Sequence, residues 1–469
     1  MKKQNLTTVS ICFVFFVFFF MFQSKYVSLV SNSKVSRSTI IDQGMRYKLI
    51  FSDLVSKSTK NWVLDHHSPP PLHSPRGRLI TCDRSHQYYD LCSINGPTVL
   101  DPATSTFFLQ GPSTMTFPSM FKEKIRPYPR KFENFVMKGI KELTITSAPQ
   151  RPKCEIQHNV PALVFSAGGY TGNFWHEFND GFIPLFITVS SVFPDQDFVL
   201  VISKARHWWV NKYAELLQAF SKHPIINLDN DTVAHCFTSA TLGLISHGFM
   251  NIDPALIPNS RTFIHFRAFL EKAYGSHGQI HPSKNNSPLV RPRLVLVSRR
   301  DSLGRVINNE AKAKLVLEKI GFDVIVFEPN PGTPLNEAYA IINSSHAMVG
   351  VHGAALTHSL FLRPGSVFVQ VVPLGLDWVA QVCFAKSARA MRLEYMEYKI
   401  KAEESSLVEK YNKNDLLIKD PVAFRGKNWS EDIMNIYLKE QNVNFDLVRF
   451  GEYFKQVYKK AKQFMDKER

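Results

Sequence analysis

Strand and helix patterns alternate regularly through the second half of this chain. Short apolar runs typical of buried strands cover residues 293–298, 323–327, 346–351 and 367–371, and helical patterns cover 310–320 and 334–342. Strands that alternate with helices at this spacing form βαβ units, whose crossovers place the strands side by side in a parallel sheet. This half therefore predicts an open α/β lobe that binds ligands beyond the carboxyl ends of its strands.

The first half shows a similar alternation. Apolar strands are predicted at 162–166 and 198–202, helices at 173–191 and 209–220, and short strand patterns lie between 98 and 145. We therefore predict an α/β fold with two Rossmann-like lobes and a cleft between them. The predicted boundaries are an N-terminal lobe at 79–285, a C-terminal lobe at 286–430 and amphipathic closing helices at 431–469.

The chain begins with a membrane-anchor pattern. Lys2 and Lys3 precede seventeen uncharged residues at 6–22, which is the short end of the range for a membrane span. Lysines on this side predict a cytosolic tail at 1–5 and a lumenal stem, rich in Ser, Lys and Pro, at 23–78. A cleaved signal peptide is the alternative, although no small-residue cleavage site follows. A short, Phe-rich span suits the thin bilayer of the early secretory pathway or Golgi.

The charge balance favours anionic partners. Lys and Arg number 56 against 40 Asp and Glu, a formal net charge of +16. Nucleotide-sugar phosphates, acidic polysaccharide, anionic membrane and nucleic acid all fit such a charge. No zinc-finger spacing or basic heptad region favours nucleic acid.

Cysteines and sequons are consistent with a lumenal domain. Apart from Cys12 in the predicted anchor, five cysteines would face an oxidising lumen, so at least one lacks a partner within the chain. Cys82 and Cys92 are predicted to bridge to each other or to Cys154 and Cys236, leaving Cys383 as a buried thiol. The sequence contains no CxxC pair, so a structural zinc site is not expected. N-glycan acceptor sequons stand at Asn230, Asn285, Asn343 and Asn428.

The first candidate site is the turn at His352-Gly353-Ala354, which follows one strand and opens a helix. Backbone N–H groups at a helix start bind phosphate, and small residues let a diphosphate approach closely. His352 could add a hydrogen bond. The alternative is a tight strand-to-helix turn without a ligand.

The second candidate is a basic cluster at another strand end. Arg299 and Arg300 follow the 293–298 strand, with Arg305 and Asn308 soon after. Guanidinium groups match phosphate oxygens, so we predict that these residues stabilise a diphosphate. The alternative is a solvated basic turn.

The third candidate is an acid–base pair on a helix. His176 and Asp180 are four residues apart and share a helix face, so the carboxylate could orient the imidazole as a general base. Glu177 is a rival base. The alternative interpretation is that these residues only begin a helix and have no catalytic role.

Two Asp-x-Asp patterns are interpreted as turns rather than metal sites, at Asp195–Asp197 and Asp229–Asp231.

Together these segments resemble plant members of glycosyltransferase family 61. The resemblance runs in family order over roughly residues 79–400. It rests on Cys82-Asp83 with Tyr89-Asp90-Leu91-Cys92, on Gly172-Asn173-Phe174-Trp175-His176-Glu177-Phe178-Asn179-Asp180, on Ser298-Arg299-Arg300, and on Val349-Gly350-Val351-His352-Gly353-Ala354-Ala355-Leu356.

The resemblance implies a type II Golgi membrane enzyme with a GT-B-like fold that inverts the anomeric centre without a metal or other cofactor. Its implied substrates are a UDP-sugar, as donor of xylose or arabinofuranose, and xylan as acceptor. Other members make the β1,2-xylose of N-glycans or transfer N-acetylglucosamine to protein. Complexes with other Golgi glycosyltransferases are a further implication.

The family pattern carries over to His176 and Asp180 on the acceptor side. On the donor side it carries over to Arg299, Arg300, His352 and Gly353. One departure is Gln370, which stands where relatives often have an acidic residue. That departure supports a rival hypothesis from another class, a lumenal glycan-binding scaffold that has lost catalysis.

Overall fold

A computed structural model describes residues 79–110, 121–275, 290–300, 302–426 and 430–468. The predicted tail, anchor and stem lie outside these ranges, as do Cys12, Asn285 and Asn428. Within the described ranges, no helix combines the length and hydropathy that a membrane crossing requires. Residues 423–435, which include helix α15 (Glu431–Met434), belong to a separate compact unit from the residues discussed below.

The second half forms the predicted parallel sheet, called sheet C. Its order is β14-β13-β15-β16-β17, and every neighbouring pair is parallel. Four of its strands match the predicted ones to within about one residue, while β17 was not predicted. The strands are β13 (Arg293–Val297), β14 (Asp323–Phe327), β15 (Ala347–Val351), β16 (Val367–Val372) and β17 (Glu394–Lys399).

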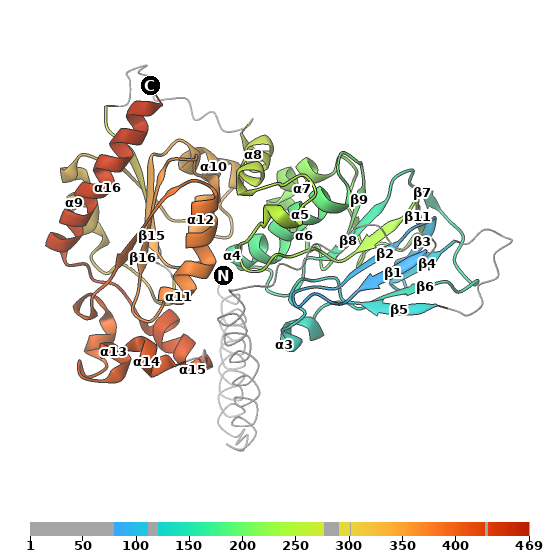
Figure 1. The fold of residues 1–469 in the computed structure, drawn as a ribbon, viewed down its shortest axis with the longest axis horizontal. Coiled ribbons are helices and arrows are strands. Elements are labelled where there is room, and N and C mark those ends of the chain that lie inside the picture. Colours follow the sequence, from blue (N-terminus) through green and yellow to red (C-terminus); the bar gives the residue numbers. More distant parts are fainter. Residues whose placement is uncertain (1–78, 111–120, 276–289, 301, 427–429, 469) are drawn as a thin grey trace, which may run out of the picture. The chain divides into compact units, whose positions relative to one another are not determined.

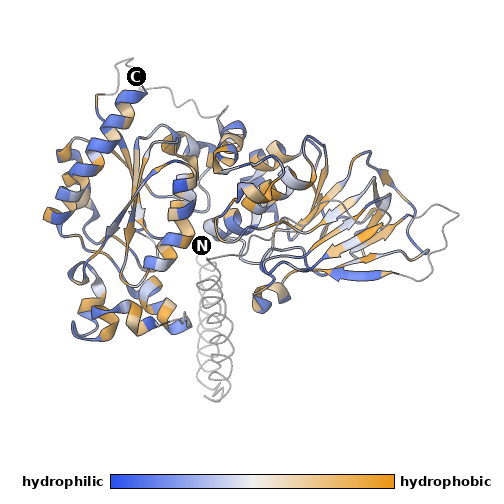
Figure 2. Ribbon diagram, viewed as in Figure 1, coloured by the Kyte–Doolittle hydropathy of each residue, from blue (hydrophilic) through white to orange (hydrophobic). Residues whose placement is uncertain are grey.

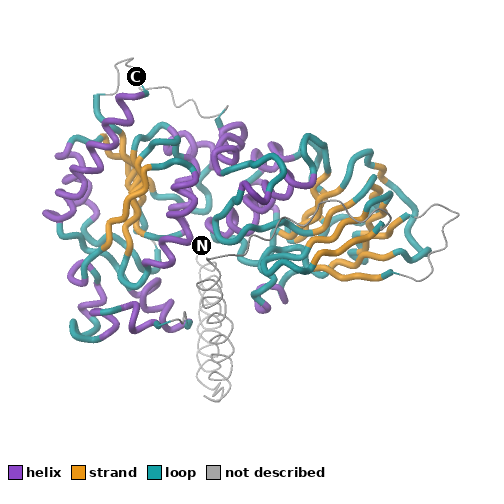
Figure 3. The backbone as a smooth tube through the Cα atoms, viewed as in Figure 1, coloured by secondary structure: helices purple, strands orange, loops and turns teal. Residues whose placement is uncertain are grey.

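Helices cover both faces of sheet C (Figures 1 and 3). Because the chain passes from β13 to β14 in one direction and then back to β15, right-handed crossovers place the helices on opposite faces. Leu294 and Leu296 face one helix layer, whereas Val295 and Val297 face the other. The first layer is α9 (Glu310–Ile320) and α16 (Leu447–Lys467); the second includes α10 (Leu335–Asn343), the 3₁₀ helix η3 (Ala354–Phe361) and α12 (Lys386–Ala390).

The first half departs from the simple Rossmann-like lobe that we predicted. Sheet A has the order β1-β2-β12-β8-β9-β10, and only its last four strands are parallel. Its strands are β1 (Ile80–Asp83), β2 (Leu91–Ile94), β12 (Ala240–Leu242), β8 (Ala162–Ser166), β9 (Val199–Ser203) and β10 (Ile226–Asn227).

A second sheet of mixed direction, sheet B, packs against sheet A. Its strands, in order, are β5 (Lys122–Ile125), β6 (Leu143–Thr146), β4 (Thr106–Leu109), β3 (Thr98–Asp101), β11 (His235–Phe237) and β7 (Ile156–Gln157). Val164 and Val201 of sheet A share a core with Phe107 of sheet B. Figure 2 shows that edge strand β5 is hydrophilic, and such charged edges discourage pairing with another sheet.

The opposite face of sheet A is covered by α5 (Ile183–Val192) and α7 (Ala214–Phe220). This helix layer continues into sheet C, because a single core cluster contains residues of both halves. Helix α8 (Phe263–Tyr274) joins them: Phe266 lies 6.4 Å from Phe178, and Tyr274 lies 5.8 Å from Phe361, between ring centroids. The two halves therefore share their hydrophobic core.

The disulfide predictions are confirmed, and the structure selects one of the two alternative pairings. Cys82 bridges Cys92, its direct antiparallel partner across β1 and β2, and Cys154 bridges Cys236. Cys383 is a half-buried free thiol. Of the sequons that the structure describes, Asn230 is exposed, whereas the half-buried Asn343 accepts a hydrogen bond from Arg267.

Helix α16 confirms the predicted amphipathic closing helix and allows a stability prediction. Phe454 is fully buried and stacks 4.3 Å from Phe450. We expect Phe454→Ala to lower the free energy of unfolding by about 3–5 kcal/mol, because it leaves a cavity under the helix. Val448 on the same helix is 77% exposed, so Val448→Ala should change that free energy by less than about 0.5 kcal/mol. Denaturant titration measures both, and equal losses would contradict this packing.

Candidate active site

The helix that carries the predicted acid–base pair begins at Asn173. The Asn173 side chain caps it by accepting hydrogen bonds from the backbone N–H groups of Trp175 and His176, at 3.0 and 3.4 Å. Helix α4 (Phe174–His176) then widens into the π-helical turn η1 (Glu177–Phe182) before α5. Single π-helical turns inside α-helices are frequent at functional sites. The predicted helix at 173–191 is thus confirmed, with an interruption that the sequence pattern did not indicate.

His176 and Asp180 form the predicted pair. Nδ1 of His176 lies 2.8 Å from Oδ2 of Asp180, which is buried. Asp180 also accepts hydrogen bonds from the Tyr128 hydroxyl (2.9 Å), Arg130 Nε (2.8 Å) and Asn179 Nδ2 (2.5 Å). Burial alone would raise the pKa of the Asp180 carboxyl, but the Arg130 charge and the His176 contact outweigh it and lower the pKa. Asp180 is therefore a carboxylate at neutral pH.

The ionised carboxylate fixes the tautomer of His176. Arg130 Nη2 also lies near Nδ1, at 3.2 Å, but the Asp180 oxygen is closer and can only accept a hydrogen bond. Nδ1 of His176 therefore carries the proton, and Nε2 carries the lone pair. The side chain is 20% exposed. An imidazole oriented by a carboxylate in this way is suited to act as a general base.

Glu177, the rival base, is occupied elsewhere. One carboxylate oxygen accepts from Gly172 N–H at 2.8 Å, and the other accepts from Trp209 Nε1 at 2.7 Å. Burial raises the pKa of this carboxyl. In this structure its side chain holds the turn before α4 against α6 (His207–Lys212), and its role as a rival base stays a prediction.

The second group of candidates meets at one edge of sheet C. The strand order reverses between β13 and β15, which are adjacent and pair Val297 with Gly350. Arg299 follows β13 and His352 follows β15, so both stand at the carboxyl edge where the order reverses. Open α/β sheets bind ligands at this position.

Gly353 lets two arginines approach the backbone. A Cβ atom at this position would lie 2.5 Å from Nη1 of Arg299 and 3.4 Å from Nη1 of Arg305. Arg305 Nη1 donates to the carbonyl of His352 at 3.0 Å. Burial lowers the pKa of both arginines, that of Arg305 to about 10 with a further contribution from Arg299. Two positive charges are thus held together with little solvent.

Several buried polar atoms at this edge have no hydrogen-bond partner among the described residues. They are Nε of Arg299 and of Arg305, Oγ of Ser298 and Oγ1 of Thr357. Burying polar groups without partners is costly, and functional sites are a common reason for such exceptions. The Nε–H groups of two arginines and two hydroxyls, all without partners, are suited to a phosphate-bearing ligand.

His352 is held as a neutral hydrogen-bond donor. Burial, with the charges of Arg305 and Arg299, lowers its pKa to about 3. Gln370 Nε2 donates to His352 Nδ1 at 2.8 Å, so the ring proton sits on Nε2. Gln370 Oε1 in turn accepts from the Tyr395 hydroxyl at 2.7 Å. Gln370, singled out as a departure from the family pattern, therefore orients His352.

The other three predicted donor-side residues are Arg300, Asn308 and Ala354. Arg300 turns away from Arg299 and bonds Glu310 at 2.7 and 3.1 Å, because successive residues at a strand end point to opposite sides. Asn308 is exposed, and its backbone N–H donates to Val443. Ala354 opens η3 and contributes only backbone, and η3 is a 3₁₀ helix. The structure therefore does not bring the Arg300 side chain together with Arg299, and the donor-binding role of Arg300 stays a prediction.

The two groups of residues share neighbours. The Phe174 ring of α4 stacks on His358 of η3 with 4.3 Å between centroids. Trp175 Nε1 donates to the carbonyl of Cys383 at 3.3 Å, and the adjacent Phe384 ring lies 5.5 Å from that of His352. Cys383 and Phe384 belong to a second π-helical turn, η4 (Gln381–Ala385). The acid–base pair and the cationic turn thus flank the same segment.

The sequence pattern missed Tyr128 and Arg130, which bind Asp180. They stand 46 to 52 residues before their partners, and no spacing signal links such distant positions.

The interpretation of both Asp-x-Asp patterns as turns is consistent with their contacts: Asp197 pairs with Lys222, Asp229 with Lys141, and Asp231 with His235. No three metal-ligating side chains converge within the part of the chain that the structure describes.

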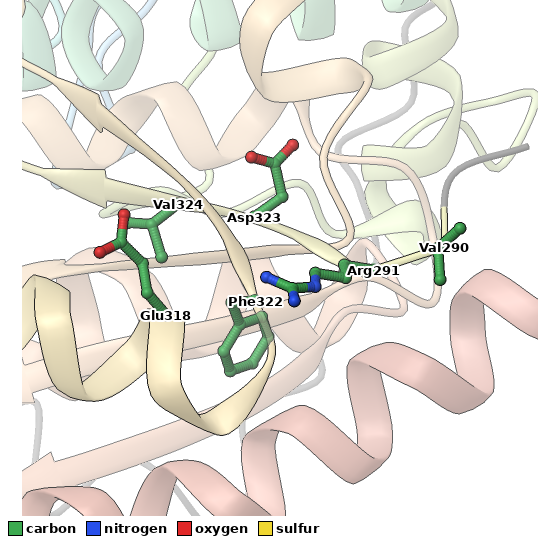
Figure 4. A pocket seen from close by; sticks show the side chains of 6 residues that line it. All are labelled: Val290, Arg291, Glu318, Phe322, Asp323 and Val324. Atoms are coloured by element: carbon green, nitrogen blue, oxygen red, sulfur yellow. The ribbon is translucent and has the colours of Figure 1, made fainter. Parts of the chain in front are cut away.

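A shallow hollow elsewhere on sheet C is not part of this site. It lies at the amino ends of β13 and β14, whereas Arg299 and His352 stand at the carboxyl edge. Figure 4 shows its lining by Val290, Arg291, Glu318, Phe322, Asp323 and Val324. Its position at the wrong edge argues against a substrate site.

Known proteins match this chain over the same region. The family model Glycosyltransferase 61 matches residues 174–369. The xylan glycosyltransferase MUCI21 of Arabidopsis thaliana is 37% identical over 92% of this chain and 90% of its own length. In Oryza sativa subsp. japonica, the beta-1,2-xylosyltransferase XYXT1 is 34% identical over 79% of this chain and 82% of its own. The alpha-1,3-arabinosyltransferase XAT2 is 32% identical over 81% and 64%, respectively.

The fold and site define a mixed α/β protein in which an oriented imidazole and a cationic phosphate-type site flank one segment. This constellation suits the transfer of a group from a phosphorylated donor to a hydroxyl. The chain belongs to glycosyltransferase family 61, and it is therefore a glycosyltransferase.

Proposed function

We propose that this enzyme transfers a pentose, xylose or arabinofuranose, from a UDP-sugar to xylan or a related cell-wall polysaccharide. The relatives named above as xylan glycosyl-, xylosyl- and arabinosyltransferases support this donor and acceptor class. We further propose a GT-B-like arrangement. We also propose a location in the Golgi lumen, which the predicted anchor supports. The observation that carries the proposal is the contact between His176 Nδ1 and the Asp180 carboxylate, which leaves Nε2 of a partly exposed ring for a substrate proton.

On the donor side, the diphosphate of the UDP-sugar occupies the edge between β13 and β15. Arg299 and Arg305 offset its negative charge, and His352 Nε2–H donates a hydrogen bond to a phosphate oxygen. As the bond from the sugar C1 to the diphosphate oxygen breaks, its electron pair remains on UDP. The arginines stabilise that developing charge, so the proposed mechanism uses no metal.

On the acceptor side, a hydroxyl of the polysaccharide attacks C1 from the face opposite UDP. The new C–O bond forms with inversion while His176 Nε2 takes the hydroxyl proton. The imidazolium that results is stabilised by Asp180, which already accepts from Nδ1. The proton then leaves to solvent from the exposed ring.

A donor screen tests this function. Full-length enzyme in detergent is assayed with UDP-xylose, UDP-arabinofuranose and UDP-N-acetylglucosamine, each with xylohexaose and excess EDTA. We expect transfer of a pentose with unchanged rate in EDTA. Transfer only of N-acetylglucosamine, or only to N-glycan or protein acceptors, would overturn the substrate class, and strict metal dependence would overturn the mechanism.

Calorimetry separates an active enzyme from a glycan-binding scaffold. An active enzyme binds UDP at the arginine site with or without acceptor present. A protein that binds xylo-oligosaccharide but no UDP would support the scaffold hypothesis instead. Protease protection of the catalytic region in intact microsomes, together with Golgi fractionation, tests the proposed location.

Replacing Gln370 with glutamate should make the donor KM depend on pH. In the wild type, His352 has a pKa of about 3 and stays neutral over the assay range, so it adds no pH dependence to the donor KM. In Gln370→Glu, the new carboxylate beside Nδ1 raises the pKa of His352. Above that pKa, the proton sits on Nδ1 and the Nε2 lone pair faces phosphate. The donor KM should therefore rise about tenfold or more with increasing pH.

Gln370→Leu serves as the control for that prediction. Without a partner for Nδ1, its donor KM should be raised at every pH and should stay flat, because no titrating group has been added. A flat profile for Gln370→Glu, matching that of Gln370→Leu, would contradict the role of Gln370 in orienting His352.

A further inference from the structure

Five partly exposed aromatic rings surround the buried Arg130 guanidinium next to His176. Four of their centroids lie 4.9 to 5.9 Å from Arg130 Cζ, and the fifth ring, that of Tyr88, packs edge-on against two of the others. We call this cluster the aromatic platform; it consists of Tyr88, Phe132, Tyr170, Trp175 and Phe249.

The platform is assembled from separate segments at the carboxyl edge of sheet A. Tyr170 follows β8, Phe249 follows β12, and Trp175 lies on α4. None of the five rings is fully buried, and Tyr170 is 36% exposed. Large apolar rings that gather at a surface without being buried mark ligand-binding surfaces.

The platform directly adjoins the proposed base. The Tyr170 ring stacks on the His176 ring with 4.2 Å between centroids, and the Trp175 ring meets it edge-on at 4.8 Å. A molecule lying on the platform would therefore present its groups to Nε2 of His176.

The charge of the platform is already balanced. Arg130 is paired with Asp180 (2.8 Å) and with Glu133 (2.8 Å), and Glu133 also accepts from the Tyr170 hydroxyl at 2.6 Å. Two carboxylates thus meet one guanidinium. A ligand carboxylate placed beside Arg130 would meet a cation that is already paired and would be repelled by the two acids.

We propose that the aromatic platform is the acceptor subsite and that it binds uncharged sugar residues next to the hydroxyl that is glycosylated. This proposal rests on the proposed transferase function and adds the acceptor class to it. Pyranose rings expose a face of C–H groups that packs on aromatic rings, and the platform offers such faces without a free positive charge.

Phe249→Ala tests the proposal in the full-length enzyme. Phe249 has no hydrogen-bonding group, and its ring lies 4.9 Å from Arg130 Cζ. Because Arg130 keeps its ion pairs with Asp180 and Glu133, removal of the ring should act mainly on acceptor binding. We expect the KM for xylohexaose to rise about five- to tenfold, with the donor KM unchanged. Trp208→Ala is the matched control, because Trp208 is a 43% exposed aromatic residue outside the platform.

A second test compares the KM values of neutral and negatively charged acceptors. Neutral xylo-oligosaccharides should have a lower KM than those carrying glucuronic acid on the sugars next to the acceptor residue. An unchanged acceptor KM in Phe249→Ala, an equal rise in Trp208→Ala, or a preference for glucuronate-bearing acceptors would each overturn the subsite.

A binding assay separates this proposal from the transferase function. Xylohexaose is titrated into donor-free enzyme while tryptophan fluorescence is followed. We expect quenching in the wild type and in Trp208→Ala, and weaker binding in Phe249→Ala; binding equal to wild type in Phe249→Ala would overturn the platform even if no transfer occurs. UDP calorimetry of the variant confirms that it is folded.

Discussion

Replacing His176 with alanine should lower kcat about 10²- to 10⁴-fold, the usual contribution of a general base. The substitution removes the only group of the pair that faces the acceptor, while Asp180 remains paired with Arg130 and Tyr128. The donor KM should change little. Steady-state release of UDP, with product analysis on xylohexaose, measures the loss.

Two further variants make the result specific. Asp180→Asn removes the negative charge that fixes the His176 tautomer, so kcat should fall in the same direction. His207→Ala removes an exposed imidazole on α6 and should leave kcat unchanged. Full activity of His176→Ala, with UDP binding intact by calorimetry, would remove the base assignment.

Replacing Arg299 with alanine should weaken UDP binding about 10- to 100-fold, the value of one charge-assisted hydrogen bond. Arg305→Ala should act in the same direction, since its guanidinium also lies beside Gly353. Gly353→Ala should weaken UDP binding as well, because the added Cβ displaces Arg299. Isothermal calorimetry with UDP measures each dissociation constant.

The neighbouring arginine is the matched control. Arg300 has the same side chain and the adjacent position, but it bonds Glu310 on the other side of the strand end. Arg300→Ala should change UDP affinity less than about threefold, as expected for an exposed charge beyond the contact range. Equal losses in Arg299→Ala and Arg300→Ala would place the diphosphate elsewhere.

The sequence predicted sheet C well because its strands are buried on both faces and read as continuous apolar runs. The edge strand β17, Glu394–Lys399, was missed because its sequence is neither a continuous apolar run nor a strict alternation of polar and apolar residues. The strand patterns predicted between residues 98 and 145 correspond to β3, β4, β5 and β6, but the sheet that they form was not predicted, because β11 pairs with β7 and with β3, about 135 residues away. The pairing of short strands that lie so far apart in the sequence leaves no local signal.

Part of the candidate site was also local in sequence. His176 and Asp180 could be paired from their helical spacing, and His352 from its place after a strand. Arg299 and Arg300 could not be distinguished, because the sequence of two adjacent arginines does not show which side chain points toward the ligand. Arg130 and Gln370 act through contacts made only when distant segments fold together.

The position of α8 has a practical consequence for exchanging parts between family members. This helix precedes the predicted lobe boundary, yet its Tyr274 packs against Phe361 and Tyr339 of the C-terminal half. In a chimera joined at residue 285, α8 would come from one parent and the helices that cover sheet C from the other. The aromatic rings that pack between them would then no longer fit each other. A graft that is meant to transplant donor preference should instead begin before Thr262, the residue that caps α8.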